Sequence, residues 1–259
     1  MPDLPAFDDL AIERHGPVAV LEIRRPPFNF FSPGLLANLV RATQALDADA
    51  GCRAIVLAAA GKVFCAGADF GEDGGGFDGE RLRSLYAEAV RLFEVRRPIV
   101  AAVQGAAIGG GLGLALAADF RVTSGAGRFS ANFSQLGLHC GFGISVTLPR
   151  VVGTQAAARL LYTGRRIDGH QAHAIGLADE CVEPGREREA AIALATEIAQ
   201  AAPLAVQDMR ATQRAGLADR VREVLQRELA CQIAHLQSAD FQEGLRAARE
   251  RRPPRFEGR

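Results

Sequence analysis

The sequence predicts an α/β fold, with a mixed core that extends to about residue 195 and a helical C-terminal part. In the first half of the chain, short apolar runs alternate with segments of helical spacing, which indicates parallel strands joined by helical crossovers. After about Thr154 the pattern changes, and the segments have mostly helical periodicity. No internal repeat and no low-complexity linker interrupts this organisation.

The first expected elements are a strand, a helix and a second strand. Val18–Ile23 alternates in hydropathy and predicts a strand. Ser32 followed by Pro33 is typical of an N-cap and the first helical residue, and opens a helix to about Leu46. Arg53–Ala60 is a continuous apolar run of strand length, which is typical of a strand covered on both faces.

The middle of the chain continues the alternation. Glu80–Arg97 has helical spacing and is followed by a proline, which ends the predicted helix. Pro98–Gly105 is a second buried strand, and a glycine-rich stretch then leads into a short helix to about Ala118. Phe120–Ser124 predicts a third strand of this core.

The remaining chain is expected to be mainly helical. We therefore divide the molecule into a core of residues 1–195 and a helical region of residues 196–259. The expected helices are Gln155–Tyr162, Gly169–Ile175, Glu187–Ala201, Leu204–Ala215 and Arg220–Leu236.

Composition narrows the function classes. The 259 residues carry 30 basic and 30 acidic side chains, so no overall field favours nucleic acid or an anionic membrane as a partner. The five cysteines lack CxxC spacing, which indicates reduced thiols rather than disulfides or a zinc site. No secretory signal pattern and no run of about 18 apolar residues is present, so we expect a cytoplasmic protein.

Two short patterns imitate metal sites. The loop Asp69–Glu80 resembles a calcium loop, but Gly71 stands at a ligand position and no helix precedes the loop. His170 and His173 share a helix face near Asp168, but no third ligand is spaced to join them. An acidic loop and a surface helix are the preferred interpretations, and no metal is expected.

Two stretches rich in small residues carry the functional signal. "GAAIGGGLGLALAAD" (Gly105–Asp119) lacks the GxGxxG fingerprint and contains no Lys or Ser for a P-loop, so phosphate binding is not supported. "GKVFCAGADF" (Gly61–Phe70) follows the other buried strand. Two such turns at the same end of parallel strands would present backbone N–H groups to one cleft. Paired donors of this kind suit an oxygen that becomes negative during a reaction, as in an oxyanion hole.

Several segments together resemble the enoyl-CoA hydratase/isomerase (crotonase) superfamily. They span almost the whole chain and include "RPPFNFFS", "GKVFCAGADF", "AVQGAAIGGGLGLALAADFRV", "RFSANFSQLGL", "LPRVVG" and "TGRRIDGHQAHAIGLADECV". The resemblance implies a spiral of ββα turns with a helical C-terminal trimerisation region, assembled as a trimer or a dimer of trimers. It also implies an acyl-CoA substrate, with no cofactor beyond the CoA moiety.

The resemblance assigns roles to particular residues. It implies that the N–H groups of Ala66 and Gly110 bind the thioester oxygen, that Ala68 faces the adenine of CoA, and that Arg24 or Arg25 meets the CoA phosphates. The full set expected at the substrate is Arg24, Arg25, Phe28, Phe64, Ala68, Asp69, Gly113, Phe133, Cys140 and Gly141.

The sequence departs from the family's hydratases at their two glutamates. Those positions are Gly113 and Phe133 here, and the aspartate that some relatives use would fall on Gly141. His139 is the candidate replacement acid or base, because imidazole titrates near neutral pH. The alternative is a loop histidine hydrogen-bonded to backbone, and Cys140 is the less favoured nucleophile.

We therefore expect an acyl-CoA enzyme that stabilises an enolate without efficient hydration. Isomerase, thioester hydrolase, decarboxylase and C–C lyase chemistry all fit these residues. The alternative of a different class is a non-catalytic acyl-CoA-binding or assembly subunit. The two are separated by whether a titratable side chain reaches the cleft.

Overall fold

The computed structural model describes residues 6–69 and 78–259. The strands are β1 (Leu10–His15), β2 (Val18–Ile23), β3 (Ala54–Ala59), β4 (Ile99–Val103), β5 (Ala106–Ile108), β6 (Phe120–Ser124), β7 (Arg128–Ser130), β8 (Arg166–Asp168) and β9 (Glu180–Val182). The helices are α1 (Pro33–Ala48), α2 (Gly79–Arg91), α3 (Gly110–Ala117), α4 (Ile144–Thr163), α5 (Gly169–Ala174), α6 (Glu187–Gln200), α7 (Pro203–Gln213), α8 (Leu217–His235) and α9 (Ala239–Glu250), with 3-10 turns η1 (Leu92–Glu94) and η2 (Asn132–Leu136).

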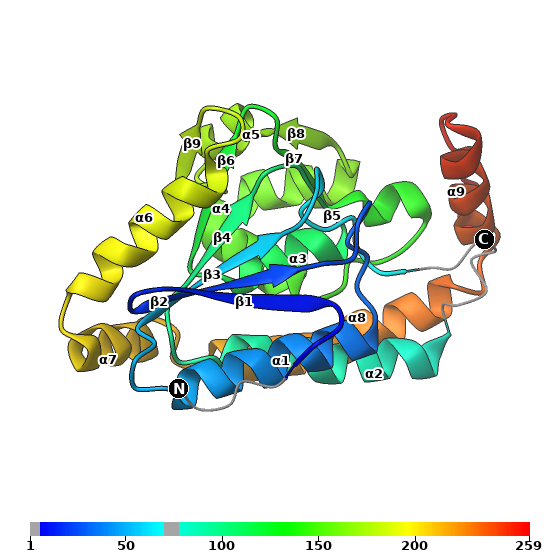
Figure 1. The fold of residues 1–259 in the computed structure, drawn as a ribbon. Coiled ribbons are helices and arrows are strands. Elements are labelled where there is room, and N and C mark those ends of the chain that lie inside the picture. Colours follow the sequence, from blue (N-terminus) through cyan, green and yellow to red (C-terminus); the bar gives the residue numbers. More distant parts are fainter. Residues whose placement is uncertain (1–5, 70–77) are drawn as a thin grey trace.

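Most of the described strands form one sheet in the order β1-β2-β3-β4-β6-β9 (Figure 1). β1 and β2 are an antiparallel hairpin, whereas β2, β3, β4, β6 and β9 pair in parallel. Every residue of β3 and β4 is buried, as their continuous apolar sequences predicted. The expected parallel pairing with helical crossovers is therefore confirmed.

A second, smaller sheet is formed by strands that alternate along the chain with the last strands of the large sheet. Its order is β5-β7-β8, with β5 and β7 parallel and β7 and β8 antiparallel. These strands have three residues each, so their sequences were too short to reveal a periodic pattern. The small sheet leads directly into α3 and η2, which carry the candidate site.

Most expected boundaries agree with the structure, and one helix is shorter. Ser32 caps α1, and its hydroxyl accepts the Leu35 N–H at 3.2 Å. The helix expected to reach Arg97 ends instead at Arg91 and continues as η1. The backbone N–H of Arg97 donates to the Asp47 carboxylate at 2.9 Å, which holds this segment outside the helix.

Helix α6 covers one face of the large sheet. Ala191, Ala195 and Ala199 follow one another at intervals of four residues and pack on Val56 and Val100 of the sheet. The expected boundary after residue 195 falls within this helix.

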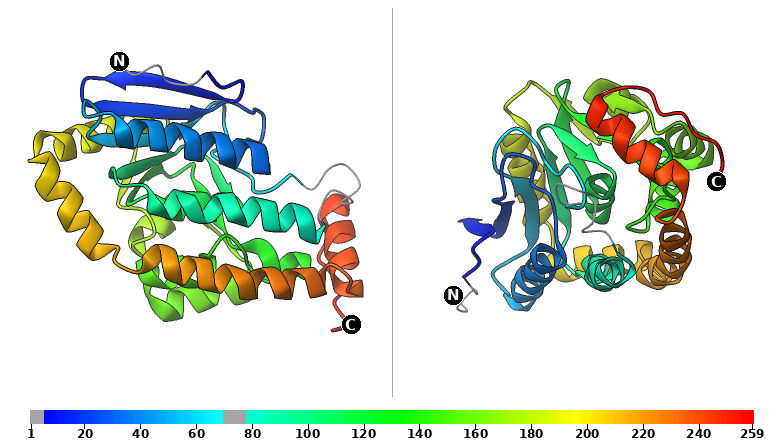
Figure 2. Two further views of the ribbon diagram at one scale, coloured as in Figure 1. Left: turned by 90° about the horizontal axis from the view of Figure 1, so that it is seen from below. Right: turned by 90° about the vertical axis from the view of Figure 1, so that its right-hand side faces the viewer.

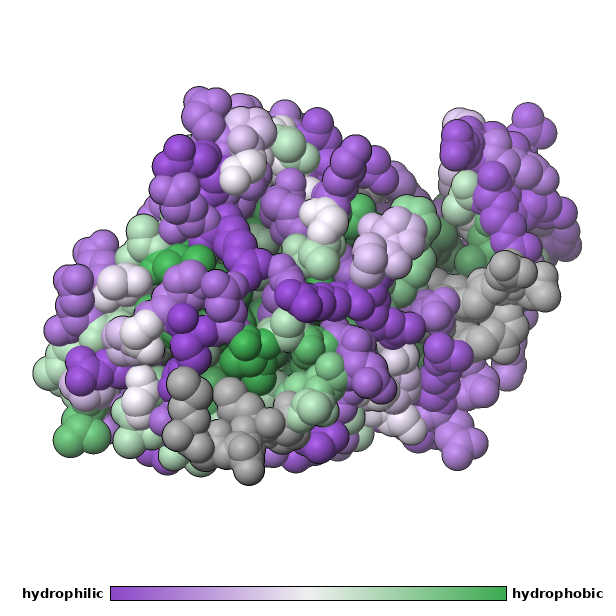
Figure 3. All heavy atoms as spheres, in the orientation of Figure 1, coloured by the Kyte–Doolittle hydropathy of each residue, from purple (hydrophilic) through white to green (hydrophobic). Residues whose placement is uncertain are grey.

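Helices α1, α2 and α8 lie side by side along the molecule (Figure 2). α2 contacts both of the others, so it connects the N-terminal and C-terminal helices. Helix α9 projects from the rest of the molecule (Figure 1). The face shown in Figure 3 is largely hydrophilic. Among the described helices, none by itself combines the length and apolar composition that a membrane crossing requires.

Candidate active site

The two turns of small residues lie next to each other beyond β3 and β4. Cys65 forms an isolated parallel bridge with Ala107 of β5, and the Ile108 N–H donates to the Cys65 carbonyl at 3.0 Å. On the other side of the same segment, Ala68 bridges to Phe31. The adjacency expected from the parallel strands is therefore present.

The structure contradicts the role assigned to Ala66. Its N–H donates to the Phe28 carbonyl at 3.0 Å, so this donor is already used inside the protein. The hydrogen bond anchors the loop that leads to α1. The expectation that Ala66 supplies an oxyanion donor is corrected for this reason.

Ala68 and Gly110 instead carry unpaired backbone donors. Neither N–H has an acceptor among residues 6–69 and 78–259. A Cβ built on Gly67, which directly precedes Ala68, would lie 3.8 Å from the Gly110 nitrogen. The two turns therefore approach each other closely. Gly110 is also the first residue of α3, where N–H groups lack intrahelical partners and the helix dipole favours negative charge.

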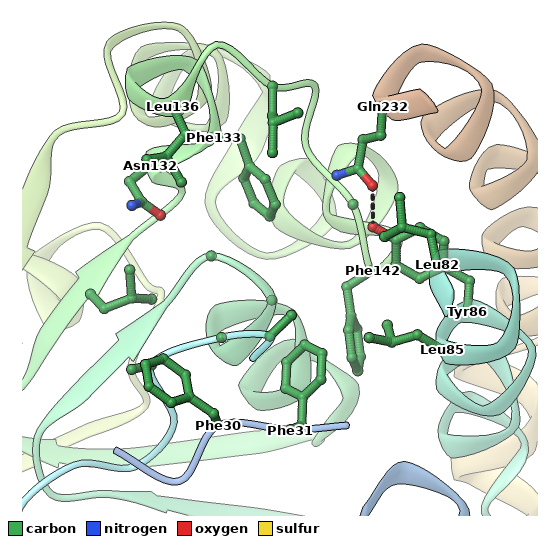
Figure 4. Close-up of a pocket in the computed structure, with 18 residues that line it drawn as sticks. Phe30, Phe31, Leu82, Leu85, Tyr86, Asn132, Phe133, Leu136, Phe142 and Gln232 are labelled. Carbon is green, nitrogen blue, oxygen red and sulfur yellow. Dashed lines mark hydrogen bonds between the residues drawn. The ribbon is translucent and has the colours of Figure 1, made fainter. Parts of the chain in front are cut away.

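A cavity of about 150 Å³ adjoins these donors (Figure 4). The glycine turns form one wall, the segment 132–142 forms a second, and helices α2 and α8 form the third. All the described side chains that line it are uncharged. The lining includes Phe31, Ala68, Tyr86, Gly110, Asn132, Phe133, Phe142 and Gln232.

An aromatic ring fills the space beside Gly113. A Cβ on Gly113 would lie 2.6 Å from the Phe142 Cβ, and Gly113 itself does not line the cavity. Phe142 has a left-handed backbone with φ of 62° and packs edge-on against Phe31, with ring centroids 5.4 Å apart. A glutamate at residue 113 would therefore collide with the ring of Phe142. Phe133 does line the cavity, as expected, but brings an apolar ring.

Tyr86 occupies the corresponding space beside Gly141. A Cβ on Gly141 would lie 1.8 Å from the Tyr86 hydroxyl oxygen, so only glycine allows this approach. The hydroxyl donates to Gln232 Oε1 at 2.6 Å, and burial raises the pKa of Tyr86. Nothing in the sequence pointed to Gln232 as the partner of Tyr86.

His139 and Cys140 do not line this cavity. They face a neighbouring cavity that shares the side chains of Phe133 and Leu138 with it. His139 Nδ1 lies 2.8 Å from the Cys140 carbonyl oxygen, as in the alternative of a loop histidine bonded to backbone. Burial raises the pKa of the Cys140 thiol, which keeps it protonated. The proposed role of His139 as acid or base is therefore not supported by its position.

One face of α8 holds the segment 139–145. Glu228, Gln232 and His235 are spaced by four and three residues, and we call them the α8 polar stripe. Glu228 accepts the Gly143 N–H at 2.8 Å, Gln232 Nε2 donates to the His139 carbonyl at 2.8 Å, and His235 Nδ1 accepts the His139 N–H at 2.9 Å. The stripe thus fixes the backbone that places Gly141 and Phe142.

The other expected contact residues are distributed differently. Arg25 donates to the Phe30 carbonyl at 3.0 Å and so supports its own loop, whereas Arg24 pairs with Glu22 on the surface. Phe28 is 51% exposed, and Phe64 is buried in the core away from the cavity. The Asp69 N–H donates to the Phe31 carbonyl at 3.2 Å, and residue 69 ends the first described range.

The residues of the two metal-like patterns have structural roles where the chain is described. Asp168 caps α5 in a capping box with Gln171, and His173 Nδ1 lies 3.1 Å from the Ala178 carbonyl. Most of the loop with the calcium-like spacing, residues 70–77, lies outside the described residues. Among those described, no group of three His, Cys, Asp or Glu side chains could hold a metal ion.

Comparison with known proteins decides the family. The model of the family described as "Enoyl-CoA hydratase/isomerase" matches residues 13–259. The chain belongs to the enoyl-CoA hydratase/isomerase family. A relative described as a putative enoyl-CoA hydratase from Thermus thermophilus is 37% identical over 258 residues, covering 93% of this chain and 98% of the relative.

Other members of the enoyl-CoA hydratase/isomerase family agree in sequence and fold. Mouse mitochondrial methylglutaconyl-CoA hydratase is 33% identical, covering 95% of this chain and 81% of that protein. The crystal structure of an enoyl-CoA hydratase/isomerase from Pseudoalteromonas atlantica has a TM-score of 0.86 at 31% identity, covering 96% of this chain and all of that one. The crotonase-like α/β fold expected from the sequence is thereby confirmed.

Proposed function

We propose that the chain is an enzyme that binds an acyl-CoA thioester and stabilises its enolate through the N–H groups of Ala68 and Gly110. The observation that carries this proposal is that both donors are unpaired among the described residues and adjoin one cavity. A donor of this kind is worth about 10² to 10³ in rate when charge develops on the bound oxygen. Membership of the family supports the acyl-CoA substrate.

The reaction that we propose is not two-carboxylate hydration. Gly113 and Phe133 carry no carboxylate, and Phe142 fills the space beside residue 113. Each positioned acid or base contributes about 10² to 10⁴ in rate, so hydration of crotonyl-CoA should be at least about 10⁴-fold slower than in a member with both glutamates. Isomerisation, thioester hydrolysis, decarboxylation and C–C cleavage remain the candidate reactions.

A second candidate is favoured by the uncharged lining of the described cavity. A non-catalytic acyl-CoA-binding subunit needs the thioester donors but no acid or base. For either function, we propose a trimer or a dimer of trimers without any cofactor beyond CoA. Light scattering of the purified protein measures the assembly, and substrate turnover separates the two functions.

The oxyanion hole is tested on the bound thioester itself. Infrared difference spectra of butyryl-CoA labelled with carbon-13 at the thioester carbonyl should show a lower C=O stretching frequency on binding, because two hydrogen bonds weaken that bond. Gly110→Pro removes one donor at a helix position that accepts proline. Gly110→Ala is the matched control, since it adds a Cβ near Phe31 but keeps the N–H.

We expect a smaller shift in Gly110→Pro than in Gly110→Ala. A bound thioester with the frequency of free butyryl-CoA would overturn the proposal. Equal shifts in the two variants would remove Gly110 from it.

A further inference from the structure

A groove on the surface between α4, β8 and α5 takes no part in the proposed function. Its volume is about 510 Å³, a size that suits a small molecule. No residue is shared between its lining and the lining of the cavity beside Ala68 and Gly110. The polar side chains of the groove are Gln155, Arg159, Arg165 and Gln171.

The periodicity of each element brings polar side chains to the groove. Gln155 and Arg159 are four residues apart on α4, so they share one face of the helix. Arg165 and Ile167 line the groove, whereas Arg166 between them does not, which is the alternation expected of an extended chain. Arg159 and Arg165 therefore reach the same groove from different elements.

Arg159 and Arg165 are cations without a counterion in the described protein. Neither guanidinium group has a hydrogen-bond or ion-pair partner among residues 6–69 and 78–259. Arg165 is half-buried, so its side chain has lost part of its water without gaining an acceptor. Arg210, in contrast, pairs with Asp119 at 2.8 Å. Two such cations in one groove indicate an anionic ligand.

The neighbouring polar groups also favour an anion. Gln171 Oε1 accepts the Asp168 N–H at 3.1 Å, so Gln171 Nε2, which has no acceptor in the described part of the chain, is left to donate to a ligand. The Asp168 carboxylate accepts the Gln171 backbone N–H at 2.9 Å and does not line the groove. No carboxylate is among the described side chains that do. The groove thus offers positive charge and N–H donors without competing negative charge.

The rest of the lining is apolar. Leu160 of α4 and Ile167 of β8 are buried, and Ile175 is half-buried beside α5. Covering apolar surface with an apolar group is favourable, because it removes that surface from water. A ligand that fills the groove therefore carries an apolar group in addition to its negative charge.

A phosphate monoester combines these properties. It carries about −1.5 to −2 charges at pH 7, which two guanidinium groups balance, whereas a carboxylate carries one. The planar fork of arginine also matches phosphate oxygens with pairs of hydrogen bonds.

We propose that the groove is a second ligand site, which binds a phosphate monoester with an apolar substituent. Arg159 and Arg165 bind the phosphate, and Ile167 contacts the substituent. The site is separate from the cavity of the proposed function and does not depend on that function.

Calorimetry at low salt with phenyl phosphate tests the ligand class. We expect phenyl phosphate to bind about tenfold more tightly than inorganic phosphate, which lacks the ring, and about tenfold more tightly than benzoate, which carries a single charge. Equal affinity for phenyl phosphate and inorganic phosphate would contradict the apolar part of the site. Equal affinity for phenyl phosphate and benzoate would contradict the preference for phosphate, and no binding of phenyl phosphate would overturn the proposal.

Charge variants test the two arginines. Arg159→Gln and Arg165→Gln should each weaken binding of phenyl phosphate about tenfold, because each loses charge-assisted hydrogen bonds. Arg166→Gln is the matched control, since Arg166 is exposed, lacks a partner in the described ranges and does not line the groove. Its affinity should change less than about twofold. Equal losses in all three variants would indicate general attraction by surface charge and rule out a defined site.

Methyl signals in nuclear magnetic resonance spectra locate the bound probe. With carbon-13 at the isoleucine δ-methyl groups, the ring of phenyl phosphate should shift the signals of Ile167 and Ile175, which line the groove. Ile108 lines the cavity of the proposed function, so it is the internal control and should not shift. Replacing each isoleucine by valine assigns the signals. A shift at Ile108 without one at Ile167 would place the probe in the other cavity, and this inference would fail while the proposed function stands.

Discussion

Gly113 and Gly141 mark two positions at which an aromatic side chain from elsewhere takes the space of a missing Cβ. Phe142 lies against the first, and the Tyr86 hydroxyl lies against the second. Both glycines are positions where relatives were expected to carry a carboxylate. The cavity therefore differs from such a site in packing as well as in charge, and adding one carboxylate would not restore it.

The close packing of Gly113 makes a direct prediction. Gly113→Ala should lower the free energy of unfolding by about 1 to 3 kcal/mol, because its methyl group would overlap Phe142 in a filled space. Gly34→Ala is the control, since the nearest atom to its Cβ is 3.8 Å away and the site is helical. Urea denaturation measures both, and an unaffected Gly113→Ala would show that Phe142 can move aside.

Glu228 should make stability depend on pH. Burial raises the pKa of its carboxyl group above the usual value, although hydrogen bonds from Ser145 and Gly143 oppose the shift. A carboxyl with a raised pKa holds its proton more tightly in the folded protein. Its stabilising contribution is therefore complete below the unfolded pKa of about 4.3 and is lost as pH rises toward the folded pKa.

The test compares the free energy of unfolding of the wild type with that of Glu228→Gln as the pH is changed. The free energy of unfolding of the wild type minus that of Glu228→Gln should decrease as pH rises above about 4.3, the pKa of the carboxyl group in the unfolded chain. Denaturant titrations at several pH values measure it. Glu223→Gln, on the exposed side of the same helix, is the control. A difference that increases with pH would contradict the raised pKa.

At the scale of elements, α8 shapes the cavity by holding the backbone of the segment 139–145 in place, besides lining it with Gln232. The α8 polar stripe binds both ends of the segment 139–145, and Gln232 also binds Tyr86 of α2. Residues 137–141 form neither helix nor strand, so these side-chain bonds take the place of the backbone hydrogen bonds of regular secondary structure. Its geometry depends on a helix about 90 residues further along the chain.

Hydrogen exchange can resolve the individual bonds of the stripe. His235→Ala removes the acceptor of the His139 N–H, so that amide should exchange about tenfold faster. The Gly143 amide is an internal control, because it donates to Glu228 and should keep its rate. Faster exchange at both amides would show that the segment opens as one unit.

At the scale of the whole molecule, much of the fold followed from local sequence patterns. The strands at residues 18–23 and 120–124 have the expected bounds, and the C-terminal helices lie where periodicity placed them. The missed elements are β1, the short strands β5, β7, β8 and β9, and α9. Strands of three residues depend on pairing partners, which periodicity does not report.

The candidate site was predicted less completely than the fold. The adjacency of the two turns followed from their small residues and from strand order, whereas Gly110 was implied by the family resemblance. The free donor at Ala68, rather than Ala66, depends on which N–H bonds to Phe28, and no spacing rule predicts that. Gln232 was missed because its role arises from tertiary contacts with Tyr86 and His139.

The C-terminal region, for which the sequence predicted an oligomerisation role in residues 196–259, builds part of the candidate site within one chain. Gln232 of this region lines the cavity directly. Helix α9 contributes indirectly, because it packs on η2, whose Leu136 also lines the cavity. A Cβ on Gly244 would lie 2.6 Å from the Leu136 carbonyl carbon, so glycine permits this contact.

Disturbing that contact should reach the ligand. Gly244→Ala should lower stability by about 1 to 3 kcal/mol and weaken binding of butyryl-CoA, because α9 must move away from η2. Gln242→Ala, exposed on the same helix, is the matched control. Thermal unfolding and calorimetry measure the two effects. Lost stability with unchanged affinity would show that η2 keeps its place without α9.

The three walls of the cavity separate two tasks that an engineer would want to change independently. The proposed donors for the thioester lie on turns that extend from the buried sheet, whereas the cavity side chains that would face the acyl group lie on α2, η2 and α8. A library confined to Leu82, Tyr86, Asn132, Phe133 and Gln232 would therefore vary which acyl group is accepted. The backbone N–H groups proposed to bind the thioester would stay the same. The same scaffold would then serve as a starting point for a set of acyl-CoA sensors or catalysts with different side-chain preferences.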